Sequence, residues 1–533
     1  MAGMLLFIFP LLFIFMGFFV GVSFTVAAVC VFICFAIGSV IILSVIYIRE
    51  LISKGDQPPV AGPIISLLRH FHRLFDYQTS LARKHRTYRM VTPSHSEIYT
   101  ADPVNVEYIL RKNFSNYGKG KYNYGVMRDM FGDGIFAVDG ETWRHQRKLA
   151  SYEFSTRVLR ELSSSVFRIN AGRLASEIYV AAAAEQIIDL QDLLMKTTLD
   201  SIFEVGFGVE LNTLSGSDEL SNQFMKAFDD SNVIVYWRYV DLLWKVKRFL
   251  NIGLEATLKK NMKMIDNFVY DLISSKREQM KNGKLDKGKE DILSRFLMES
   301  EKDPENMNEK YLRDITLNFI IAGKDTTANT LTWFFYMLCR HPFVQEKIVH
   351  EVREVTEAEN SMSIDGFASS LTETALEKMQ YLHAALTETL RLYPAVPVDG
   401  KSAEEDDVLP DSFKVKKGDG VNYIAYAMGR MTYVWGEDAE EFKPQRWLQN
   451  GIFCAESPFK FPAFHAGPRI CLGKEFAYRQ MKILASFLLF FFRFKLADES
   501  KEATYRTMFT LHMDKGLHLY AFPRLTEKSA SVC

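Results

Sequence analysis

The first 48 residues form an apolar run without a charged side chain, and Arg49 is the first charged residue after it. A membrane-spanning helix needs about 20 apolar residues, so residues 1–48 could hold one span or two. A cleaved signal peptide would start with basic residues and would have a shorter apolar core. The pattern therefore predicts an N-terminal transmembrane anchor over residues 1–48.

A basic and proline-rich hinge is expected over residues 49–64, directly after the anchor. Its string QPPVAGPI contains three prolines and one glycine, which cannot continue a helix. Arg49, Lys54, Arg69 and Arg73 place positive charge just beyond the apolar run, which favours the cytoplasm for this side. No second linker or repeat follows, so residues 65–533 are expected to form a single domain.

Helical periodicity dominates this domain from about residue 140 to residue 392. Short alternating segments, YRMVTP and SEIYTA, precede it and read as strands, and Asp102 followed by proline is a typical helix start. Further strands are expected at 408–415 and at 507–522, where the sequence Asp-Lys-Gly predicts a hairpin turn. The fold class expected is mainly α with small β-sheets.

Composition narrows the possible functions. A hydrophobic content of 48% with 24% charged residues is typical of a globular protein, and a net charge of −1 gives no basic field for a nucleic acid partner. The six cysteines form no CxxC pair or Cys/His cluster, so neither a zinc site nor a disulfide framework is indicated. Any functional thiol is therefore expected to act alone.

One such thiol is Cys471, in the stretch FPAFHAGPRICLGKEFAYRQM. It lies between glycines, two residues after an arginine and just before an apolar-periodic run. Packing is the usual role of an unpaired cysteine, and the stretch alone leaves that alternative open.

A second unusual stretch is NFIIAGKDTTANTLTWFFYML, residues 318–338, which predicts a long buried helix ended by His341 and a proline. Its centre carries Gly323, Asp325, Thr326 and Thr327, which are weak helix formers. A polar surface face is the alternative, but FII before them and WFF after them argue against it. Polar groups inside an apolar helix need partners or a ligand.

Two further segments carry charges that could meet. Glu388 and Arg391 lie three residues apart on one predicted helix, and Arg446 follows in the string PQRW. We expect the three to form a buried charge network, although each alone is more often a surface residue.

These four motifs, in this order, resemble those of the cytochrome P450 superfamily of haem-thiolate monooxygenases, from the hinge to the last hairpin. The resemblance implies the cytochrome P450 fold and haem b as cofactor, held by an axial cysteine thiolate. The positions that match the haem-binding signature are Phe464, Gly467, Arg469, Cys471 and Gly473. It makes Cys471 the axial ligand of the iron and Arg469 a partner of a haem propionate.

The resemblance assigns roles to the remaining motifs as well. Trp143 and Arg147 match the helix that binds the propionates together with Arg469. The Glu388, Arg391 and Arg446 set matches a structural network, with PQRW where the family often has Pro-Glu-Arg-Phe.

Asp325 and Thr326 match the acid–alcohol pair that delivers protons during oxygen activation. Gly323 is expected to open room for dioxygen beside the helix, and Lys324 is expected to face away, without a role. The intact pair favours a monooxygenase over members that rearrange hydroperoxides without dioxygen, and over a non-catalytic haem-binding protein on the same fold.

Three stretches, including LYPAVPVDGKSAEEDDVLPD, resemble the plant clan of fatty-acid ω-hydroxylases and its 704-like family. The implied reaction uses O2 and electrons from NADPH to hydroxylate a long-chain fatty acid at or near the ω carbon; another apolar plant metabolite, terpenoid or sterol-like, is the alternative. The pocket is expected from Val396–Val398, Tyr117–Phe136, Phe319 and Leu511.

The resemblance also implies a partner and a location. Electrons come from NADPH–cytochrome P450 reductase in the same membrane, the endoplasmic reticulum, with the catalytic domain facing the cytoplasm and in contact with lipid. We expect an acidic reductase surface to dock on five basic residues, although ordinary solvated helix faces explain them nearly as well: Arg144, Lys148, Lys474, Arg479 and Lys482. A membrane-tethered receptor in which Cys471 only packs is the reading without the resemblance.

Overall fold

The computed structural model describes most of the chain beyond the predicted anchor. The described residues are 29, 30, 33, 34, 38, 45 and 48, then 56–92, 95–154, 157–216, 219–241, 243–282, 291–359 and 361–524. The predicted anchor over residues 1–48 therefore lies outside the described residues apart from isolated positions, as do residues 49–55 of the hinge. Where the chain is described, no helix is long and apolar enough to cross a membrane.

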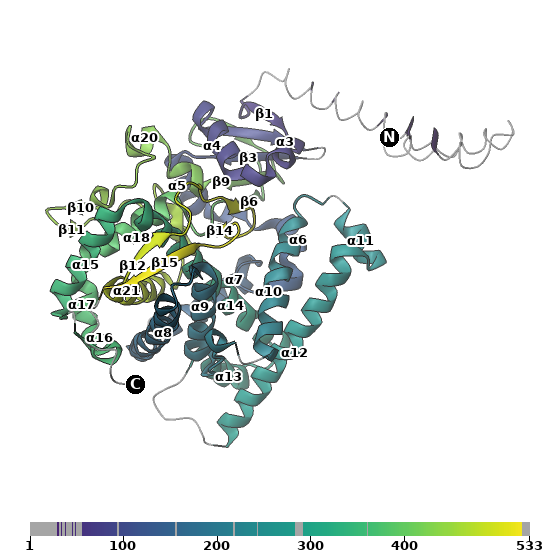
Figure 1. Cartoon of the computed structure of the whole chain (residues 1–533). Coiled ribbons are helices and arrows are strands. Elements are labelled where there is room, and N and C mark those ends of the chain that lie inside the picture. Colours follow the sequence, from purple (N-terminus) through teal and green to yellow (C-terminus); the bar gives the residue numbers. More distant parts are fainter. Residues whose placement is uncertain are drawn as a thin grey trace.

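The described part of the chain is mainly helical with small sheets, as the sequence predicts (Figure 1). The helices are α3 (Ile65–Arg69), α4 (Leu74–Lys84), α5 (Pro103–Glu107), α6 (Gly120–Phe131), α7 (Gly140–Phe154), α8 (Arg157–Ala183), α9 (Leu190–Phe207), α10 (Glu219–Trp237), α11 (Trp244–Leu250), α12 (Gly253–Lys281), α13 (Ile292–Lys302), α14 (Glu309–Arg340), α15 (Pro342–Thr356), α16 (Ile364–Ser370), α17 (Glu373–Lys378), α18 (Gln380–Leu392), α19 (Ala425–Met428), α20 (Thr432–Trp435) and α21 (Lys474–Phe491).

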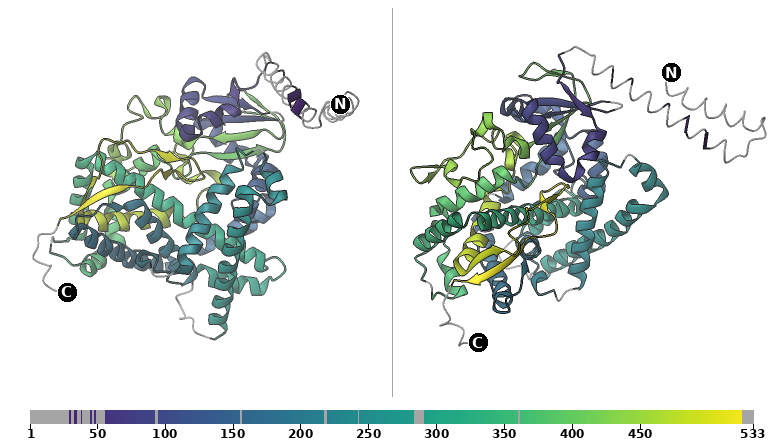
Figure 2. Two further views of the ribbon diagram at one scale, coloured as in Figure 1. Left: turned by 45° about the vertical axis from the view of Figure 1, so that its right-hand side comes forward. Right: turned by 45° about the horizontal axis from the view of Figure 1, so that its top comes forward.

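The largest sheet lies at one side of the molecule, and most helices lie on the other (Figure 2). Its strand order is β1 (Val60–Pro63), β2 (Thr87–Val91), β3 (Ser96–Thr100), β9 (Gly420–Tyr423), β6 (Asp399–Ala403) and β4 (Tyr117–Gly118). β1 runs parallel to β2 and β3 runs parallel to β9, whereas the other neighbours are antiparallel. The sheet thus joins strands from residues 60–118 with strands from residues 399–423.

Smaller sheets complete the fold. β12 (Phe492–Leu496), β15 (His518–Pro523) and β5 (Ile188–Asp189) form a sheet in that order. Three pairs stand apart: β7 (Asp407–Val408) with β8 (Lys414–Val415), β10 (Leu448–Gln449) with β11 (Ile452–Phe453), and β13 (Tyr505–Arg506) with β14 (His512–Met513).

Two local predictions differ from the structure. Val60–Pro63, inside the segment predicted as a hinge, form the edge strand β1, where a proline is tolerated because one side of the strand needs no donor. The turn at Asp514–Gly516 does not close a hairpin, because β14 pairs with β13 and β15 pairs with β12 and β5. The hairpin near the C-terminus instead has its tip between β13 and β14.

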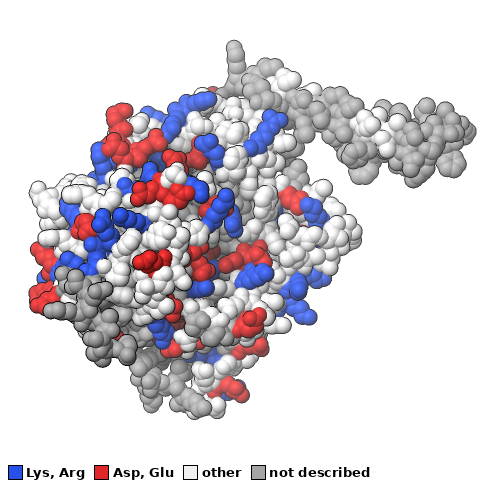
Figure 3. All heavy atoms as spheres, viewed as in Figure 1, with Lys and Arg blue, Asp and Glu red and all other residues white. Residues whose placement is uncertain are grey.

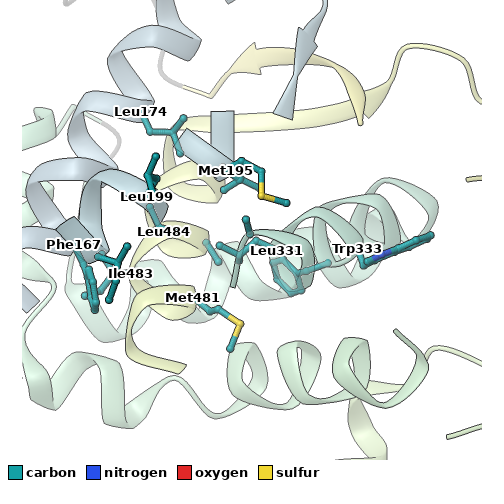
Figure 4. Packing of buried hydrophobic residues seen from close by; sticks show 14 of the residues in the cluster. Phe167, Leu174, Met195, Leu199, Leu331, Trp333, Met481, Ile483 and Leu484 are labelled. Atoms are coloured by element: carbon teal, nitrogen blue, oxygen red, sulfur yellow. The ribbon is translucent and has the colours of Figure 1, made fainter. Parts of the chain in front are cut away.

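The core fixes α14 beside α21, the helix that follows Cys471. Figure 4 shows Phe167 and Leu174 of α8, Met195 and Leu199 of α9, Leu331 and Trp333 of α14, and Met481, Ile483 and Leu484 of α21 in one hydrophobic cluster. Burying a large apolar side chain stabilises the fold by about 1.5–3 kcal/mol, so this cluster holds the four helices together firmly.

The long helix α14 has the ends that its sequence indicates. Asn308 caps its N-terminus by accepting a hydrogen bond from the Tyr311 amide at 3.1 Å. The helix ends at Arg340, and Pro342 begins α15. Its polar centre is therefore held at a defined height in the core.

Candidate functional site

The loop around Cys471 is fixed by backbone contacts. The Cys471 amide donates to the Phe464 carbonyl at 2.8 Å, which closes a turn over the short helical segments Pro462–Phe464 and Gly467–Arg469. Gly467 has a φ of +65°, and a Cβ there would overlap with the Leu110 carbonyl oxygen. Only glycine fits this position, which explains the first glycine of the motif.

The sulfur of Cys471 lies near one hydrogen-bond donor and two positively charged side chains. The pKa of the thiol is raised by burial, while the Gly473 amide, which donates to it, and the charges of Arg147 and Lys474 lower it. The sulfur also lies just before the N-terminus of α21, whose dipole favours a thiolate. Cys471 nevertheless keeps accessible surface, so this surface faces the inside of the fold.

Arg147, Arg469 and Trp143 lie close to one another beside the cysteine loop. The Arg469 guanidinium lies 4.4 Å from the Trp143 ring centre, and it donates to the Val138 carbonyl at 3.0 Å and to Asp139 Oδ1 at 2.5 Å. Burial lowers the pKa of both Arg147 and Arg469, and the charge of Arg469 lowers that of Arg147 further. The structure thus brings together three residues that the sequence predicted as one group.

Lys401 joins this group, although the sequence motifs did not point to it. It is 1% exposed, and its Nζ lies 3.0 Å from Asp399 Oδ2 without forming a hydrogen bond. Burial, and then the charges of Lys119 and Arg469, lower its pKa to about 7. Alternation along β6 was the available signal, because Lys401 and Ala403 share the inward face.

These residues fit the haem that the resemblance implies. Arg147 forms no ion pair within the described residues, and the buried Arg469 Nε has no hydrogen-bond partner there. Like charges this close are costly unless anions compensate for them, and the two carboxylates of haem are such anions. The sulfur of Cys471 beside them would supply the iron ligand as a thiolate.

The acid and the alcohol on α14 both have hydrogen-bond partners. Asp325 Oδ2 accepts from Asn232 Nδ2 of α10 at 3.0 Å, and the Thr326 hydroxyl donates to the Ala322 carbonyl at 2.7 Å. Lys324 does not face away from them as expected, because its Nζ lies 3.0 Å from Asp325 Oδ1. The polar centre of this buried helix is therefore satisfied from neighbouring elements.

The expectation for Gly323 is also wrong. A Cβ at this position would lie 2.8 Å from the side chain of Ile202 in α9. Because Gly323 has no side chain, α9 can pack closely against α14. The Ile202 side chain fills the space beside the glycine, so no room for a ligand remains on that side.

The predicted charge network is buried and densely hydrogen-bonded. Glu388 and Arg391 have no exposed side-chain surface, and the Arg391 Nε and Nη2 donate to the carboxylate at 2.8 and 2.7 Å. Trp447 Nε1 donates to Glu388 Oε2 at 2.9 Å, and Arg446 Nε lies 3.5 Å from Oε1. The network ties α18 to the segment before the cysteine loop.

Some predicted pocket residues converge near α14. The Leu511 amide at the β13–β14 tip donates to the Ala395 carbonyl at 2.9 Å, next to Val396–Val398. Its carbonyl accepts from Trp333 Nε1 of α14 at 2.8 Å. Phe319 instead has its ring contacts with Phe154 and Phe296, which places it in the hydrophobic core.

The five basic residues predicted for docking do not form one surface. Lys482 is only 9% exposed and donates to the Leu376 carbonyl at 2.7 Å, so its inclusion was wrong. Arg479 lies 3.1 Å from Glu373 Oε2. Arg144 and Lys148 remain exposed and Lys474 is half-buried. Acidic and basic groups are interspersed over the face shown in Figure 3.

Comparison with known proteins identifies this combination of fold and site. Residues 55–520 match the family described as Cytochrome P450. The chain is 52% identical over 491 residues to Cytochrome P450 704C1 of Pinus taeda, which covers 90% of this chain and 95% of that protein. Cytochrome P450 704B1 of Arabidopsis thaliana is 46% identical over 488 residues, 86% of this chain and 93% of that protein. Cytochrome P450 86B1 of Arabidopsis thaliana is 41% identical over 426 residues, 78% of this chain and 76% of that protein. The chain therefore belongs to the cytochrome P450 family of haem-thiolate monooxygenases, as a member of its 704-like branch.

Proposed function

We propose that Cys471 is the axial ligand of the haem iron and that Arg147, Arg469, Lys401 and Trp143 hold the haem propionates. The proposal rests on the geometry of the cysteine loop. A tight turn places the accessible Cys471 sulfur just before the N-terminus of α21 and near the charges of Arg147 and Lys474. When bound, haem supplies the activation of dioxygen for insertion into a C–H bond. Glu388, Arg391 and Arg446 keep the loop in place and take no part in the chemistry.

Proton delivery is the task proposed for Asp325 and Thr326. A carboxylate accepts a proton from water and passes it on, and an adjacent hydroxyl can both donate and accept. The Thr326 hydroxyl donates to its own helix at Ala322, and it can rotate toward another acceptor without loss of that helix turn. Asp325 lies one residue before it in α14, where Asn232 holds its second oxygen.

The proposed substrate is a long-chain fatty acid, hydroxylated at or near its ω carbon. The proposal is supported by the sequence resemblance to the plant ω-hydroxylase clan and by the apolar segments that meet near α14. Each methylene that leaves water contributes about 0.8 kcal/mol, so a long acyl chain can bind with few polar contacts. Attack on the terminal carbon requires firm positioning, because its C–H bonds are the least reactive.

We also propose that electrons come from NADPH through a membrane-bound reductase and that the protein is anchored in the endoplasmic reticulum, facing the cytoplasm. The charge-free run over residues 1–48 supports the anchor. Exposed apolar residues around α11 support contact with lipid: Leu243, Val246, Phe249, Leu250, Ile252 and Leu254.

The test of this function is turnover of medium- to very-long-chain fatty acids in membranes that hold the protein and a plant reductase, with products identified by mass spectrometry. Terminal alcohols formed only with NADPH are expected. A ferrous–CO spectrum on the same membranes reports the thiolate-bound haem, and Cys471→Ala should abolish it. A normal spectrum without any fatty-acid product would refute the substrate class and favour another apolar metabolite.

A further inference from the structure

Lys324 is a buried cation at the polar centre of α14. Its side chain is 2% exposed, and its Nζ lies 3.0 Å from Asp325 Oδ1 and 2.5 Å from Asp229 Oδ1 of α10. The ring of Phe228, also in α10, lies 5.6 Å from the same nitrogen. The lysine therefore connects the acid of the proposed proton path to a second helix.

The charge on this lysine is permanent at neutral pH. Burial alone would lower the pKa of Lys324, but the carboxylates of Asp229 and Asp325 raise it above its ordinary value. Such a group keeps its proton and cannot relay one near pH 7. A role in orientation is consistent with this chemistry, and a role as acid or base is not.

One oxygen of Asp325 is bound directly from α10, and the other is linked to α10 through Lys324. Oδ1 contacts Lys324, which is paired with Asp229, and Oδ2 accepts a hydrogen bond from Asn232 at 3.0 Å. We call these four residues the α10–α14 tether. Apart from it, α10 packs against α12 and α6. The position of the Asp325 carboxylate is thus linked to the position of α10.

We propose that Lys324 is a positioning residue that orients the Asp325 carboxylate for proton delivery and, through Asp229, makes this orientation depend on the placement of α10. The inference rests on the proposed role of Asp325. Without Lys324, two carboxylates would face each other without a cation, and Asp325 would turn away or take up a proton permanently. The two electrons from NADPH would then reduce dioxygen, with two protons, to hydrogen peroxide instead of supporting hydroxylation.

The surroundings of the tether contain other titratable groups. Asp229 keeps accessible surface, yet burial and the charge of Asp325 raise its pKa, and Asp230 adds to this effect. His512 of β14 is close enough to feel the charges of Asp325 and Lys324, and burial lowers its pKa to about 4, so it is neutral at pH 7. Lys324 is thus the cation that the two carboxylates share.

The test compares Lys324→Met, Lys324→Arg and wild type as full-length proteins in membranes with reductase. Product and hydrogen peroxide are measured per NADPH, and amide hydrogen exchange over residues 229–236 is followed in the same proteins. General acid–base groups contribute about 10²–10⁴-fold, so a misplaced acid should lower the yield of product per NADPH about tenfold. Lys324→Arg should restore it to within about threefold. Exchange in α10 should be faster in Lys324→Met than in Lys324→Arg.

Lys276→Met is the matched control, because Lys276 of α12 is similarly buried and is ion-paired with Asp291 at the start of α13, without a contact to Asp325. It should lower stability while product yield per NADPH stays at the wild-type value, and because α12 packs against α10, exchange in α10 is compared only between Lys324→Met and Lys324→Arg. If Lys324→Met lacks a ferrous–CO spectrum, Asp229→Asn removes only the outer anchor and should reduce the yield about threefold with faster α10 exchange.

Unchanged product yield together with unchanged α10 exchange in Lys324→Met would overturn the proposal, as would equal effects of Lys324→Met and Lys276→Met on product yield. Failure of the proposed function gives a different result. In that case wild type makes no fatty-acid product, while faster α10 exchange in Lys324→Met still supports the tether.

Discussion

Burial lowers the pKa of three lysines with little exposed surface, and their neighbours decide whether that effect is offset. Lys324 faces two carboxylates, and its pKa is raised. Lys401 lies 3.0 Å from Asp399, but burial together with the charges of Lys119 and Arg469 lowers its pKa to about 7. Lys482 has mainly a carbonyl partner, and burial lowers its pKa to about 8. Lys324 is therefore suited to hold a carboxylate permanently. The positive charge of Lys401 would be stabilised most when a haem propionate lies beside it.

His383 gives a residue-scale prediction about pH. Its ring stacks on Tyr478 at 4.2 Å, and burial, followed by the charges of Lys482 and Lys474, lowers its pKa to about 3. As pH falls below about 6.5, His383 therefore binds a proton in the unfolded chain, whereas in the folded chain it binds one only near pH 3. Stability from this group is complete above pH 6.5 and is lost as pH falls toward 3, by about 2 kcal/mol at pH 5.

Urea unfolding of His383→Phe at pH 7.5 and pH 5.0 measures this effect. The variant should lose about 2 kcal/mol less than wild type between the two pH values, because the ring is kept and the titration is removed. His350→Phe, at an exposed position of α15, is the control and should behave as wild type. Equal losses in wild type and His383→Phe would contradict the prediction.

Single residues were predictable from sequence where a motif fixes both type and spacing. Cys471, Gly467 and Arg469 lie where their motif places them, because a turn this tight allows few alternatives. Lys482 was misplaced because its depth depends on how α17 packs against α21, which no local pattern records. Lys324 was misjudged for the same reason, since Asp229 is distant in sequence.

At the scale of elements, the α9–α14 contact depends on one missing side chain. A Cβ on Gly323 would lie 2.8 Å from Ile202, so Gly323→Ala must push the helices apart or force Ile202 into a strained rotamer. Overpacking of this kind costs about 1–3 kcal/mol. Ile202→Ala alone leaves a cavity, whereas in the double variant the new methyl group partly fills that cavity.

A double-mutant cycle on thermal unfolding tests this contact. The double variant should be less destabilised than the sum of the two single variants, with a coupling of about 1 kcal/mol or more. Additive losses would mean that α9 and α14 adjust without strain. Haem content should stay constant throughout, because neither residue faces the cations around Cys471.

Helix ends were predictable because their signals are local, and strand pairing was not. Asp102 caps α5 by accepting from the Val104 amide at 2.8 Å, as its sequence indicates. The turn at Asp514–Gly516 failed as a hairpin because Asp189 of β5 accepts from the Leu517 amide at 3.0 Å and draws β15 into another sheet. A partner so far away in sequence leaves no periodicity near the turn.

At the scale of the whole molecule, exposed apolar residues gather around α11, the surface proposed to contact lipid. Phe249 is 88% exposed, and Leu250 and Val246 lie beside it on the same short helix. If lipid covers this surface, a photoreactive benzophenone side chain in place of Phe249 should form adducts with lipid in native membranes. The same group at Phe343 of α15, which is 76% exposed, is the matched control and should form none. Lipid adducts of equal yield at both positions would place the membrane elsewhere.

The surface near Cys471 is where we expect the reductase to dock. With Lys482 buried, Arg479 paired to Glu373 and Arg144 paired to Glu141, the accessible positive charge there comes mainly from the exposed Lys148 and the half-buried Lys474. An acidic partner steered to this surface would meet these groups early in the encounter. Lys148→Glu with Lys474→Glu should therefore slow reduction by the reductase about tenfold or more at low salt and weaken its dependence on ionic strength.

Stopped-flow reduction over a range of salt concentrations measures both quantities. Lys259→Glu with Lys260→Glu carries the same charge change on exposed positions of α12, which lies on the other side of the molecule from α21 and α17 (Figure 1). A similar slowing in both double variants would show that net charge alone governs the encounter and would remove the docking surface. Slowing confined to Lys148→Glu with Lys474→Glu, at unchanged haem content, would place electron entry on the side of the molecule that carries Cys471.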